Sequence, residues 1–376
     1  MLELKIHTDI STIGQATWSR LCGSDYPFLR YEFLHALEQS ASVSPQTGWQ
    51  PLHIVAEQQG DVIAVMPLYL KTHSYGEYVF DWAWADAYQR HGLEYYPKLV
   101  TAIPFTPATG PRIGSQAPAA DVMPAFLDAI RQLAQRFNAS SWHGLFVEPD
   151  LRQSLEASNL TLRLGTQYHW FNEGFHSFDH FMEKFASRKR KNIRRERQKV
   201  AEQQISLRRI EGSDISPALL DTFYAFYQNT YLKRGRSGYL TPEFFKLLHQ
   251  NMPEQLLLVI AEKDGQPVAA ALSLKSSSTL YGRYWGCRDD YDSLHFETCY
   301  YQGIEYCIEQ GLERFDPGAQ GEHKIQRGFQ PIDTWSGHWI RHPGFAQAIN
   351  KAMEQECSAM REQINELSRW LPFRKE

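Results

Sequence analysis

An acid, an imidazole and an amine follow one another at Glu322, His323 and Lys324, inside a glycine-rich loop that begins just after Asp316. Carboxylates, imidazoles and amines are the side chains that exchange protons at active sites. A short strand is predicted at 314–316, so these four side chains would lie on a polar loop at the end of a strand. We therefore expect this loop to carry catalytic residues.

Two strands and a helix must position that loop. The residues 280–285 predict an apolar, aromatic strand, an acidic loop follows, and a helix is expected from about His295 to Gln310 before the strand at 314–316. Upstream, the β-like runs 256–262 and 268–275 are joined through an Asp-Gly turn, which is a strong hairpin signal. Strand, loop, helix, strand and polar loop is an order of elements that builds a site.

The most concentrated charge lies on the segment 181–202, which is predicted to be a helix with an apolar side. Eight of the twelve residues from Arg188 to Lys199 are basic and Glu196 is the only acid among them, so few i,i+4 pairs offset the repulsion. A solvated helix face is the ordinary explanation of such a run. The shortage of acids favours a bound anion, such as the phosphate of a nucleotide, tRNA or sugar diphosphate. The candidates for substrate contact are Arg188, Arg190, Lys191, Arg194 and Arg195.

Three further side chains near the loop are weaker candidates. His295 and Glu297 begin the central helix, although a carboxylate at a helix N-terminus is favourable through the helix dipole alone. Tyr284 is a candidate for substrate contact, with packing in the core as its alternative. No metal site is indicated, because His338 and His342 lie in a predicted strand and turn and would not share a face.

An internal repeat relates the two halves of the chain. Residues 55–64 match residues 260–269 at a constant offset of 205, and weaker matches continue from 75–78 beside 281–284 to the histidine His91. Each half would then carry an antiparallel hairpin, a third strand and a helix that begins near the histidine. Strands with antiparallel neighbours and covering helices predict an α+β layer fold, not a doubly wound parallel sheet.

A length of 376 residues predicts two domains. We place them at 1–165 and 166–376. The second domain contains the basic segment 181–202 and ends in an amphipathic helix at 344–371. That helix either docks on the body or pairs with a second copy, so a monomer and a homodimer are both open.

Composition limits the classes of function. The net charge of −4 argues against a surface generally coated by nucleic acid, so no DNA partner is expected. Five cysteines without a C-x-x-C pair indicate reduced thiols. Neither a signal-peptide pattern nor an apolar run of 18 residues is found, which predicts a cytoplasmic protein and leaves peripheral membrane contact open.

These features together resemble a known family. Tandem copies of a hairpin, strand and helix are similar to the duplicated GNAT-type acyltransferase domains of the FemABX peptidyltransferases. The segment 187–195 resembles the basic helix of that group, and 315–318 with 327–329 resembles its late strand and Phe-Lys-x-Gly-Phe turn. The chain looks more closely like a bacterial FemAB-like family of peptidoglycan biosynthesis or recognition proteins. That likeness rests on Asp25-Tyr26-Pro27-Phe28, Pro104-Phe105-Thr106-Pro107-Ala108-Thr109-Gly110-Pro111-Arg112 and Pro317-Gly318-Ala319-Gln320-Gly321-Glu322-His323-Lys324.

The resemblance implies transfer of an acyl group from a thioester or an aminoacyl-tRNA ester to an amine. The donor would be held where the two strands that flank the central helix part. Glu322 or His323 would be the general base, Lys324 would face the oxyanion or a carboxylate, and Asp316 would orient the amine. Each role has an alternative. Glu322 and His323 would be a hydrogen-bonded pair that shapes the loop, Lys324 would be a surface lysine, and Asp316 would cap backbone amides.

Two departures from the family pattern affect the donor and the oxyanion. Three aspartates at 289–292 stand where coenzyme A users carry a glycine-rich pyrophosphate loop, which disfavours acetyl-CoA and favours an aminoacyl-tRNA. Gln326 replaces the lysine of the Phe-Lys-x-Gly-Phe turn. Lys324 or Arg327 would have to take its place.

Two classes of function follow. One is an N-acyltransferase of FemAB-like type that acts on a peptidoglycan precursor or another amine, with acyl-CoA or aminoacyl-tRNA as the possible donor. The other is a non-catalytic module that recognises an anionic glycan or nucleotide. A GNAT acetyltransferase with an atypical acetyl-CoA site is a third possibility. The residues at 322–324 favour an enzyme, because a binding module has no need of them.

Overall fold

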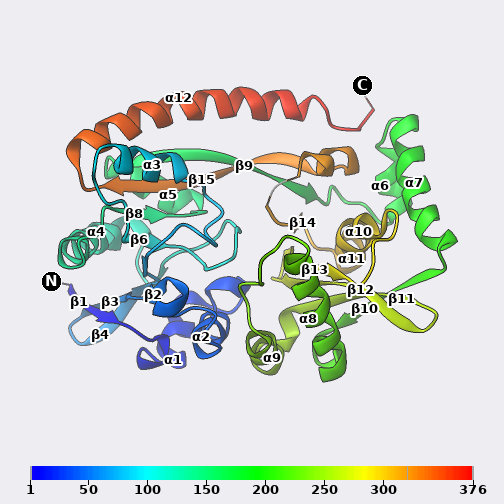
Figure 1. Ribbon diagram of the computed structural model, residues 1–376, viewed down its shortest axis with the longest axis horizontal. Helices are drawn as coiled ribbons and strands as arrows, with labels where there is room; N and C mark the ends of the chain where they lie inside the picture. The colour runs from blue at the N-terminus through cyan, green and yellow to red at the C-terminus, as the bar shows by residue number, and fades with distance from the viewer. Residues whose placement is uncertain (1, 320, 375–376) are drawn as a thin grey trace. The chain divides into compact units, whose positions relative to one another are not determined.

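The chain forms two compact units of strands and helices (Figure 1). The computed structural model describes residues 2–319 and 321–374, so Gln320 of the glycine-rich loop lies outside the described residues. The first unit comprises residues 1–166 and 333–363, and the second comprises 167–332 and 364–376. The predicted division at residue 165 assigns the segment 333–363 to the second domain, whereas the structure places it in the first unit.

The second unit is built on a mixed sheet with the strand order β10-β11-β12-β13-β14-β9. All neighbours are antiparallel except β13 and β14, which run parallel. The strands are β9 Thr161–Phe171, β10 Ile205–Glu211, β11 Leu256–Lys263, β12 Gln266–Lys275, β13 Thr279–Cys287 and β14 Arg314–Asp316.

The first unit repeats this scheme in two parts. β1, β3 and β4 are antiparallel neighbours with β7 beside β4, and β2, β5, β6, β8 and β15 follow one another in the second part. Within the described residues, β6 and β8 of this unit run parallel. The mixed architecture of both units confirms the predicted α+β class. The strands are β1 Glu3–His7, β2 Trp49–Pro51, β3 His53–Gln58, β4 Asp61–Met66, β5 Tyr69–Lys71, β6 Lys98–Thr101, β7 Gly114–Ser115, β8 Ser141–Gly144 and β15 Gln330–Ile340.

The predicted repeat is confirmed in one hairpin. The hairpins β3–β4 and β11–β12 have a register shift at the same place, between Ala56 and Glu57 in one and between Ala261 and Glu262 in the other. Their turns also match, since residues 59–60 and 264–265 all have positive φ. A β-bulge is a specific local feature that related domains retain, so its recurrence at the offset of 205 supports duplication.

The rest of the predicted repeat is wrong for the first unit. Residues 75–78 form a loop rather than a third strand, and α3 (Trp82–Arg90) ends before His91 instead of beginning there. The structural counterpart of β13 is β6, because each is the first strand of the parallel pair. Gly76 has a φ of +81°, which is incompatible with a strand. The segments 75–78 and 281–284 are therefore similar in residue type but do not occupy equivalent positions in the fold.

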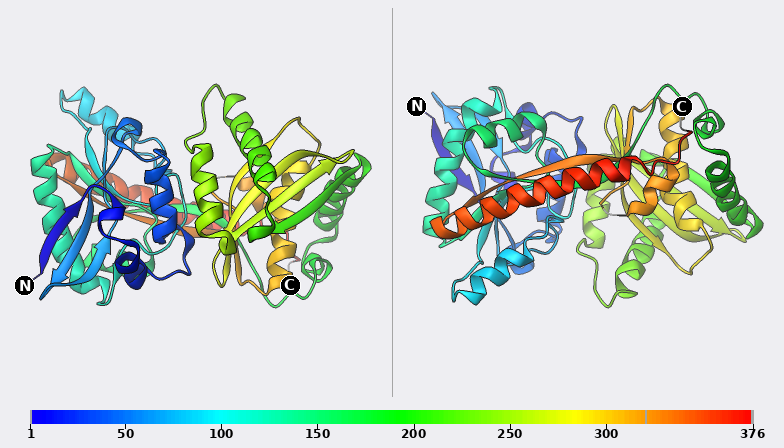
Figure 2. Two further views of the ribbon diagram at one scale, coloured as in Figure 1. Left: turned by 90° about the horizontal axis from the view of Figure 1, so that it is seen from below. Right: turned by 90° about the horizontal axis from the view of Figure 1, so that it is seen from above.

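Helices cover the sheets of each unit. In the first unit α4 (Ala119–Arg136) packs its apolar side against Leu99 and Trp142. In the second unit α7 (Ser187–Glu202) packs along β10 (Figure 2). No helix within the described parts of the chain is long and apolar enough to span a bilayer. The other helices are α1 Gln15–Cys22, α2 Tyr31–Gln39, α5 Pro149–Ala157, α6 Phe178–Glu183, α8 Pro217–Leu232, α9 Pro242–Asn251, α10 Leu294–Phe296, α11 Gln302–Gln310 and α12 Pro343–Ser368.

The predicted central helix has an interruption. It consists of α10, a π-helical turn at Glu297–Tyr301 and α11, and it ends at Gln310 as expected. π-Helical turns are rare and occur frequently at functional sites. The turn places Glu297, Tyr300 and Tyr301 in the interior of the second unit.

Candidate active site

β13 and β14 run parallel for only three residues and then part. Residues 279–281 pair with 314–316, after which β13 continues to Cys287 beside β12. The chain leaves β14 through Gly318, whose φ is +91° and where a Cβ would lie 3.3 Å from the carbonyl oxygen of Gly282. The strands thus part at the expected place, with a carboxylate at the fork.

Asp316 forms a buried ion pair at this fork. Its Oδ2 accepts a hydrogen bond from Arg283 at 2.6 Å, and its Oδ1 accepts one from the amide of Gly318 at 2.9 Å. His169 Nε2 lies 3.5 Å from Oδ1. Burial alone would raise the pKa of Asp316, but Arg283 and His169 outweigh it and hold that pKa well below its usual range. Asp316 is therefore a fixed anion at neutral pH.

Lys324 places a buried amine next to this pair. Its Nζ donates to the carbonyl oxygens of Gly318 at 2.7 Å and Ala319 at 3.4 Å, and the side chain is 2% exposed. It lies in the 3₁₀ segment η7 (Glu322–Arg327). Burial lowers the pKa of Lys324 to about 8, with Asp316 opposing the shift. The amine is therefore mostly protonated at pH 7 and loses its proton in a mildly alkaline solution.

His323 is an exposed imidazole held by a buried phenol. Its Nε2 lies 2.9 Å from the hydroxyl of Tyr300. Partial burial and the cations of Arg327 and Lys324 lower the pKa of His323, so the ring is neutral at pH 7. When Nε2 donates to Tyr300, Nδ1 keeps a lone pair that can take a proton. Gly321 lies under the ring, because a Cβ there would be 2.5 Å from His323 Cε1.

The structure places the two remaining loop candidates differently. The ring of His295 lies 5.2 Å from that of Trp285 and 5.3 Å from that of Tyr300, so it joins the His323 group. Burial lowers the pKa of His295 to about 4, which keeps it neutral. Glu322 is exposed and makes no hydrogen bond or ion pair within the described residues.

Side chains of the turn at the Phe-Lys-x-Gly-Phe position contact α7. Arg327 donates to Glu196 at 2.7 Å and its guanidinium lies 3.4 Å from the ring centroid of Phe296. Gln326 accepts a hydrogen bond from Lys189. With Arg327 engaged in these contacts, Lys324 is the amine beside the fork. A pocket of about 220 Å³ is lined by Lys189, Asn192, Ile193, Glu196, Gln326 and Arg327.

The C-terminal half of α7 is neutralised by acids from other elements. Arg197 contacts Glu297 at 2.9 Å and Glu305 at 2.6 Å, and Lys199 contacts Asp292 at 2.6 Å. The shortage of acids within the helix does not require a bound anion here, because acidic partners come from the central helix and from the loop before it. These cations are structural contacts within the second unit.

The N-terminal half of α7 keeps its charge. Its first turn contains no acid, and the N-cap residue Ala186 provides no side-chain hydrogen bond. A helix N-terminus carries partial positive charge of its own, so cations there repel it unless an anion is bound. Arg194 has only a 3.5 Å contact with Asp179, and both side chains are mostly exposed. Side chains without a hydrogen bond or ion pair to any described residue are Arg188, Arg190, Lys191 and Arg195.

The acidic loop before the central helix is balanced by cations. Its three carboxylates are mostly exposed, so water and salt screen them. The repulsion of a pyrophosphate is therefore weaker than the sequence alone indicates. The lack of a glycine-rich pyrophosphate loop still disfavours acetyl-CoA. The pairs are Asp289 with Arg288 at 3.0 Å, Asp290 with Lys233 at 2.8 Å and Asp292 with Lys199 at 2.6 Å.

Sequence reasoning missed Arg283, His169 and Tyr300. Arg283 and His169 had a signal, since each is a polar residue among aromatic residues of a buried strand and such a residue needs a partner. Tyr300 had none, because an aromatic residue at helical spacing predicts core packing. Conversely, the candidate Tyr284 packs against the aromatic side chains of α8 and α9 in the core.

Two α+β units, each with a parallel strand pair in a largely antiparallel sheet, define a tandem protein of GNAT type. The chain belongs to the FemAB-like family, described as peptidoglycan biosynthesis/recognition, which it matches over residues 9–375. Family membership places it among proteins of that process, and its fold is that of acyltransferases.

Solved structures share this fold. The chain is similar to FemX, with 14% identity, a TM-score of 0.55 and coverage of 93% of this chain and 100% of that one. It is also similar to the C-terminal domain of a putative lysylphosphatidylglycerol synthetase from Agrobacterium fabrum, with 11% identity, a TM-score of 0.55 and coverage of 90% and 95%. No curated protein sequence matches the chain significantly.

Proposed function

We propose that the second unit is the catalytic unit of a FemAB-like N-acyltransferase, which moves an acyl or aminoacyl group to an amine of a peptidoglycan precursor or a related acceptor. The observation that carries this proposal is the buried ammonium of Lys324 beside the Asp316–Arg283 pair, where β13 and β14 part. The family and the fold support the reaction class. A module that only binds has no use for such an amine.

The proposed reaction uses three groups of the loop. The acceptor amine attacks the donor carbonyl carbon, a C–N bond forms and the carbonyl oxygen becomes an oxyanion. His323 Nδ1 takes the proton that the amine loses, with Glu322 as the alternative base, and the Lys324 ammonium stabilises the oxyanion. The carbon–oxygen or carbon–sulfur bond to the leaving group then breaks, and the base returns the proton to the leaving atom. Asp316 holds Arg283 and the loop in place.

The unpaired cations of α7 are the proposed site for the anionic part of a substrate. A phosphate there would pair with the uncapped helix N-terminus and with Arg188 and Lys191, which lie on one face of the helix, and a second phosphate would meet Arg190. The pocket between α7 and η7 is lined by Lys189 of the same helix end and by Gln326 and Arg327 of the segment that holds Lys324. An aminoacyl-tRNA or a UDP-linked precursor supplies such phosphates. A coenzyme A thioester has less support, because the glycine-rich loop is missing.

Ligand-induced stabilisation tests the proposal. Thermal unfolding is followed with acetyl-CoA, a longer acyl-CoA, a UDP-linked peptidoglycan precursor and an aminoacyl-tRNA. A ligand at 100 times its Kd stabilises a protein by about 2.7 kcal/mol. We expect the precursor or the tRNA to stabilise the wild type, and an Arg188→Ala, Arg190→Ala, Lys191→Ala variant to lose most of that effect.

A matched variant controls for net charge. Arg234→Ala, Arg236→Ala, Lys246→Ala removes the same charge from exposed positions of the second unit and should behave as the wild type. Transfer is then measured with the ligands that bind, and Lys324→Met should lose turnover while it retains binding. Stabilisation by acyl-CoA that is equal in both triple variants would favour the atypical acetyltransferase. Binding without turnover for every donor and acceptor would favour the recognition module.

A further inference from the structure

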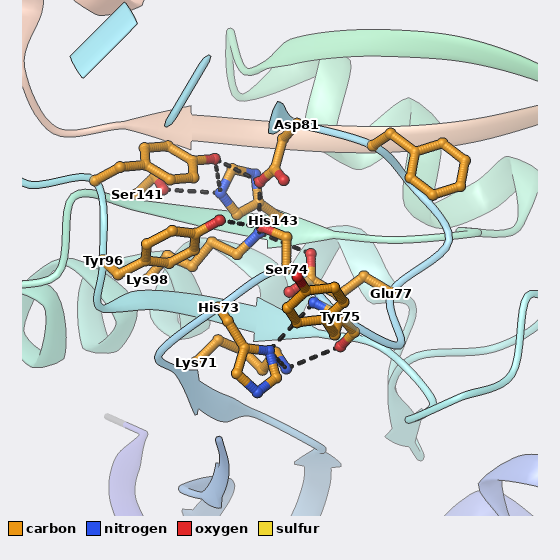
Figure 3. A network of polar contacts seen from close by, with 12 residues as sticks. Lys71, His73, Ser74, Tyr75, Glu77, Asp81, Tyr96, Lys98, Ser141 and His143 are labelled. Carbon is orange, nitrogen blue, oxygen red and sulfur yellow. Dashed lines mark hydrogen bonds and ion pairs between the residues drawn. The ribbon is translucent and has the colours of Figure 1, made fainter. Parts of the chain in front are cut away.

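The first unit contains a buried cluster of charged side chains that the proposed reaction does not use (Figure 3). Lys98, the first residue of β6, is fully buried, and its Nζ donates to Ser74 at 2.8 Å, to Glu77 at 2.7 Å and to Asp81. Burial alone would lower the pKa of Lys98, but the two carboxylates outweigh it and raise that pKa. Lys98 is therefore a permanent ammonium in a cage of three acceptors.

Lys71 is a second buried amine in this cluster, at the end of β5. Its Nζ lies 3.7 Å from the centroid of a Trp49 ring and donates to the carbonyl oxygen of Tyr75 at 3.2 Å. No carboxylate among the described residues contacts it. Burial lowers the pKa of Lys71 to about 7, with Glu77 opposing the shift. The amine is thus half uncharged at neutral pH.

Two carboxylate oxygens of the cluster lack a donor. Glu77 Oε1 and Asp81 Oδ1 have no hydrogen-bond partner among the described residues, although the side chains are only 4% and 3% exposed. A buried polar atom without a partner is costly, and structures rarely leave one without a reason. The cluster therefore has two acceptors available to a ligand that brings N–H or O–H groups.

Exposed aromatic rings surround the same segment. Tyr75, Phe80 and Trp82 are 47%, 51% and 40% exposed, and the rings of Tyr75 and Trp82 are 5.3 Å apart. All three belong to the stretch between β5 and α3, or to its end, which also supplies Ser74, Glu77 and Asp81. Aromatic faces attract cations, and exposed aromatic groups of this kind mark binding surfaces.

The cluster has the same types of group as the site of the second unit. In each unit, a cation on the first strand of the parallel pair contacts a buried aspartate, a buried lysine titrates near neutral pH, and a buried imidazole of the same sheet is kept neutral. The matching groups are Lys98–Asp81 and Arg283–Asp316, Lys71 and Lys324, and His143 and His169. These groups lie on different elements in the two units, so the likeness is one of chemistry and not of position.

We propose that the cluster is a binding site for a primary ammonium group. The ammonium would donate to Glu77 Oε1 and Asp81 Oδ1, and the aromatic rings would cover the body that carries it. An anion would be repelled by the two carboxylates, and an alcohol has a single O–H donor and no positive charge, so it would bind much more weakly than an ammonium. Entry requires the stretch from 72 to 81 to open, and that stretch contains neither helix nor strand.

The ammonium has two sources, the acceptor of the proposed transfer or a separate amine. If the ammonium belongs to the acceptor, the inference rests on the proposed function. Binding of an amine to the protein tests the ammonium site without any transfer reaction. Failure of binding and failure of transfer are therefore distinguishable.

The affinity should fall as the solution becomes acidic. Burial raises the pKa of Glu77 to about 7, where Lys71 also titrates, so the charge of these two with Lys98 and Asp81 changes from −1 above pH 7 to +1 below it. Burial keeps His143 and His338 neutral throughout this range. The other titratable or charged groups that face the cluster are His73, Tyr95, Tyr96 and Arg163, and none of them reverses this change.

Calorimetry with benzylamine and benzyl alcohol measures the site directly. The two probes have the same shape and differ in the ammonium group. We expect the wild type to bind benzylamine at pH 8, at least fivefold more weakly at pH 6, and to bind benzyl alcohol at least tenfold more weakly than benzylamine at pH 8. Equal binding of the two probes, or of benzylamine at the two pH values, would overturn the proposal.

Variants separate a ligand site from a structural ion pair. Lys71→Met removes the competing amine, so it should bind benzylamine severalfold more tightly at pH 6 and show a smaller pH dependence, since Glu77 still titrates; a purely structural cluster predicts no gain. Asp81→Asn should bind at least tenfold more weakly, and Glu77→Gln supplies the same test if that variant does not fold. Asp86→Asn removes a charge from an exposed position of α3 and should bind as the wild type.

A transfer assay then assigns the source. If the ammonium belongs to the acceptor, Glu77→Gln raises the KM for the acceptor and leaves the KM for the donor unchanged. If it belongs to a separate amine, benzylamine binds without competing with the acceptor. Either outcome retains the site, and absence of benzylamine binding in both wild type and Lys71→Met removes it.

Discussion

Lys324 and Arg283 are both buried beside Asp316, yet only Lys324 titrates near neutral pH. A guanidinium stays protonated in proteins, whereas an ammonium loses its proton readily when it is buried. The pKa of Lys324 falls to about 8 because burial outweighs the attraction of Asp316. A cation that titrates there gives the proposed reaction an upper pH limit.

The transfer rate should therefore fall as the pH rises through about 8, because the oxyanion loses its ammonium. In Lys324→Arg the guanidinium keeps its charge, so the falling limb should disappear below pH 10 even if the overall rate is lower. Measurement of kcat/KM from pH 6 to pH 10 checks this, with circular dichroism to confirm folding. An unchanged limb in Lys324→Arg would assign it to another group.

At the scale of the element, α7 begins in a way that opposes its own stability. Ala186 has the extended backbone of an N-cap, with φ −58° and ψ 143°, but its methyl group cannot accept a hydrogen bond, and no acid follows in the first turn. Serine or aspartate at an N-cap is worth about 0.5–2 kcal/mol relative to alanine. Uncapped amides and unpaired cations at one helix end are what an anion site requires.

Ala186→Asp and Ala186→Ser should consequently separate stability from binding. Both should raise the free energy of unfolding by about 0.5–2 kcal/mol through the new cap. Only Ala186→Asp places a negative charge among the cations, so it should weaken binding of the phosphate ligand by tenfold or more, while the serine variant weakens it less. Urea unfolding and ligand titration measure the two effects. If Ala186→Asp retains full affinity, the anion does not bind at this helix end.

Elements with a strong local pattern could be predicted from the sequence, and their partners could not. The hairpin with its Asp-Gly turn, the basic helix and the loop at 316–324 all depend on neighbouring residues. The acids that neutralise Arg197 lie 100 and 108 residues away along the chain, and no local signal connects them. The buried cluster around Lys98 was missed for the same reason, since its members are ordinary polar residues until the fold buries them.

At the scale of the whole molecule, the two units present opposite charge to their proposed ligands. The second unit offers exposed cations on α7, and the first offers buried carboxylate oxygens. Exposed charges are screened over about 8 Å at physiological ionic strength, whereas buried charges are screened much less. The two proposed sites therefore differ in their response to salt.

Raising NaCl from 50 to 500 mM should weaken the binding of the phosphate ligand more than tenfold and the binding of benzylamine less than threefold. Calorimetry of the wild type at the two concentrations makes the comparison, with Lys71→Met as a second protein for the amine. If benzylamine binding falls as steeply as phosphate binding, the ammonium binds on the surface and not at the buried cluster.

The segment 333–363 belongs to the first unit although it follows the second unit in the chain. The ribosome therefore makes residues 167–332 of the second unit before it supplies most of β15 and most of α12 to the first. Until then β8 lacks its antiparallel neighbour, and that edge stays open to other chains or to a chaperone. A premature stop near residue 332 would consequently remove most of β15 from the first unit, although residues 1–166 of that unit are translated first, and it would also remove residues 364–376 from the second unit.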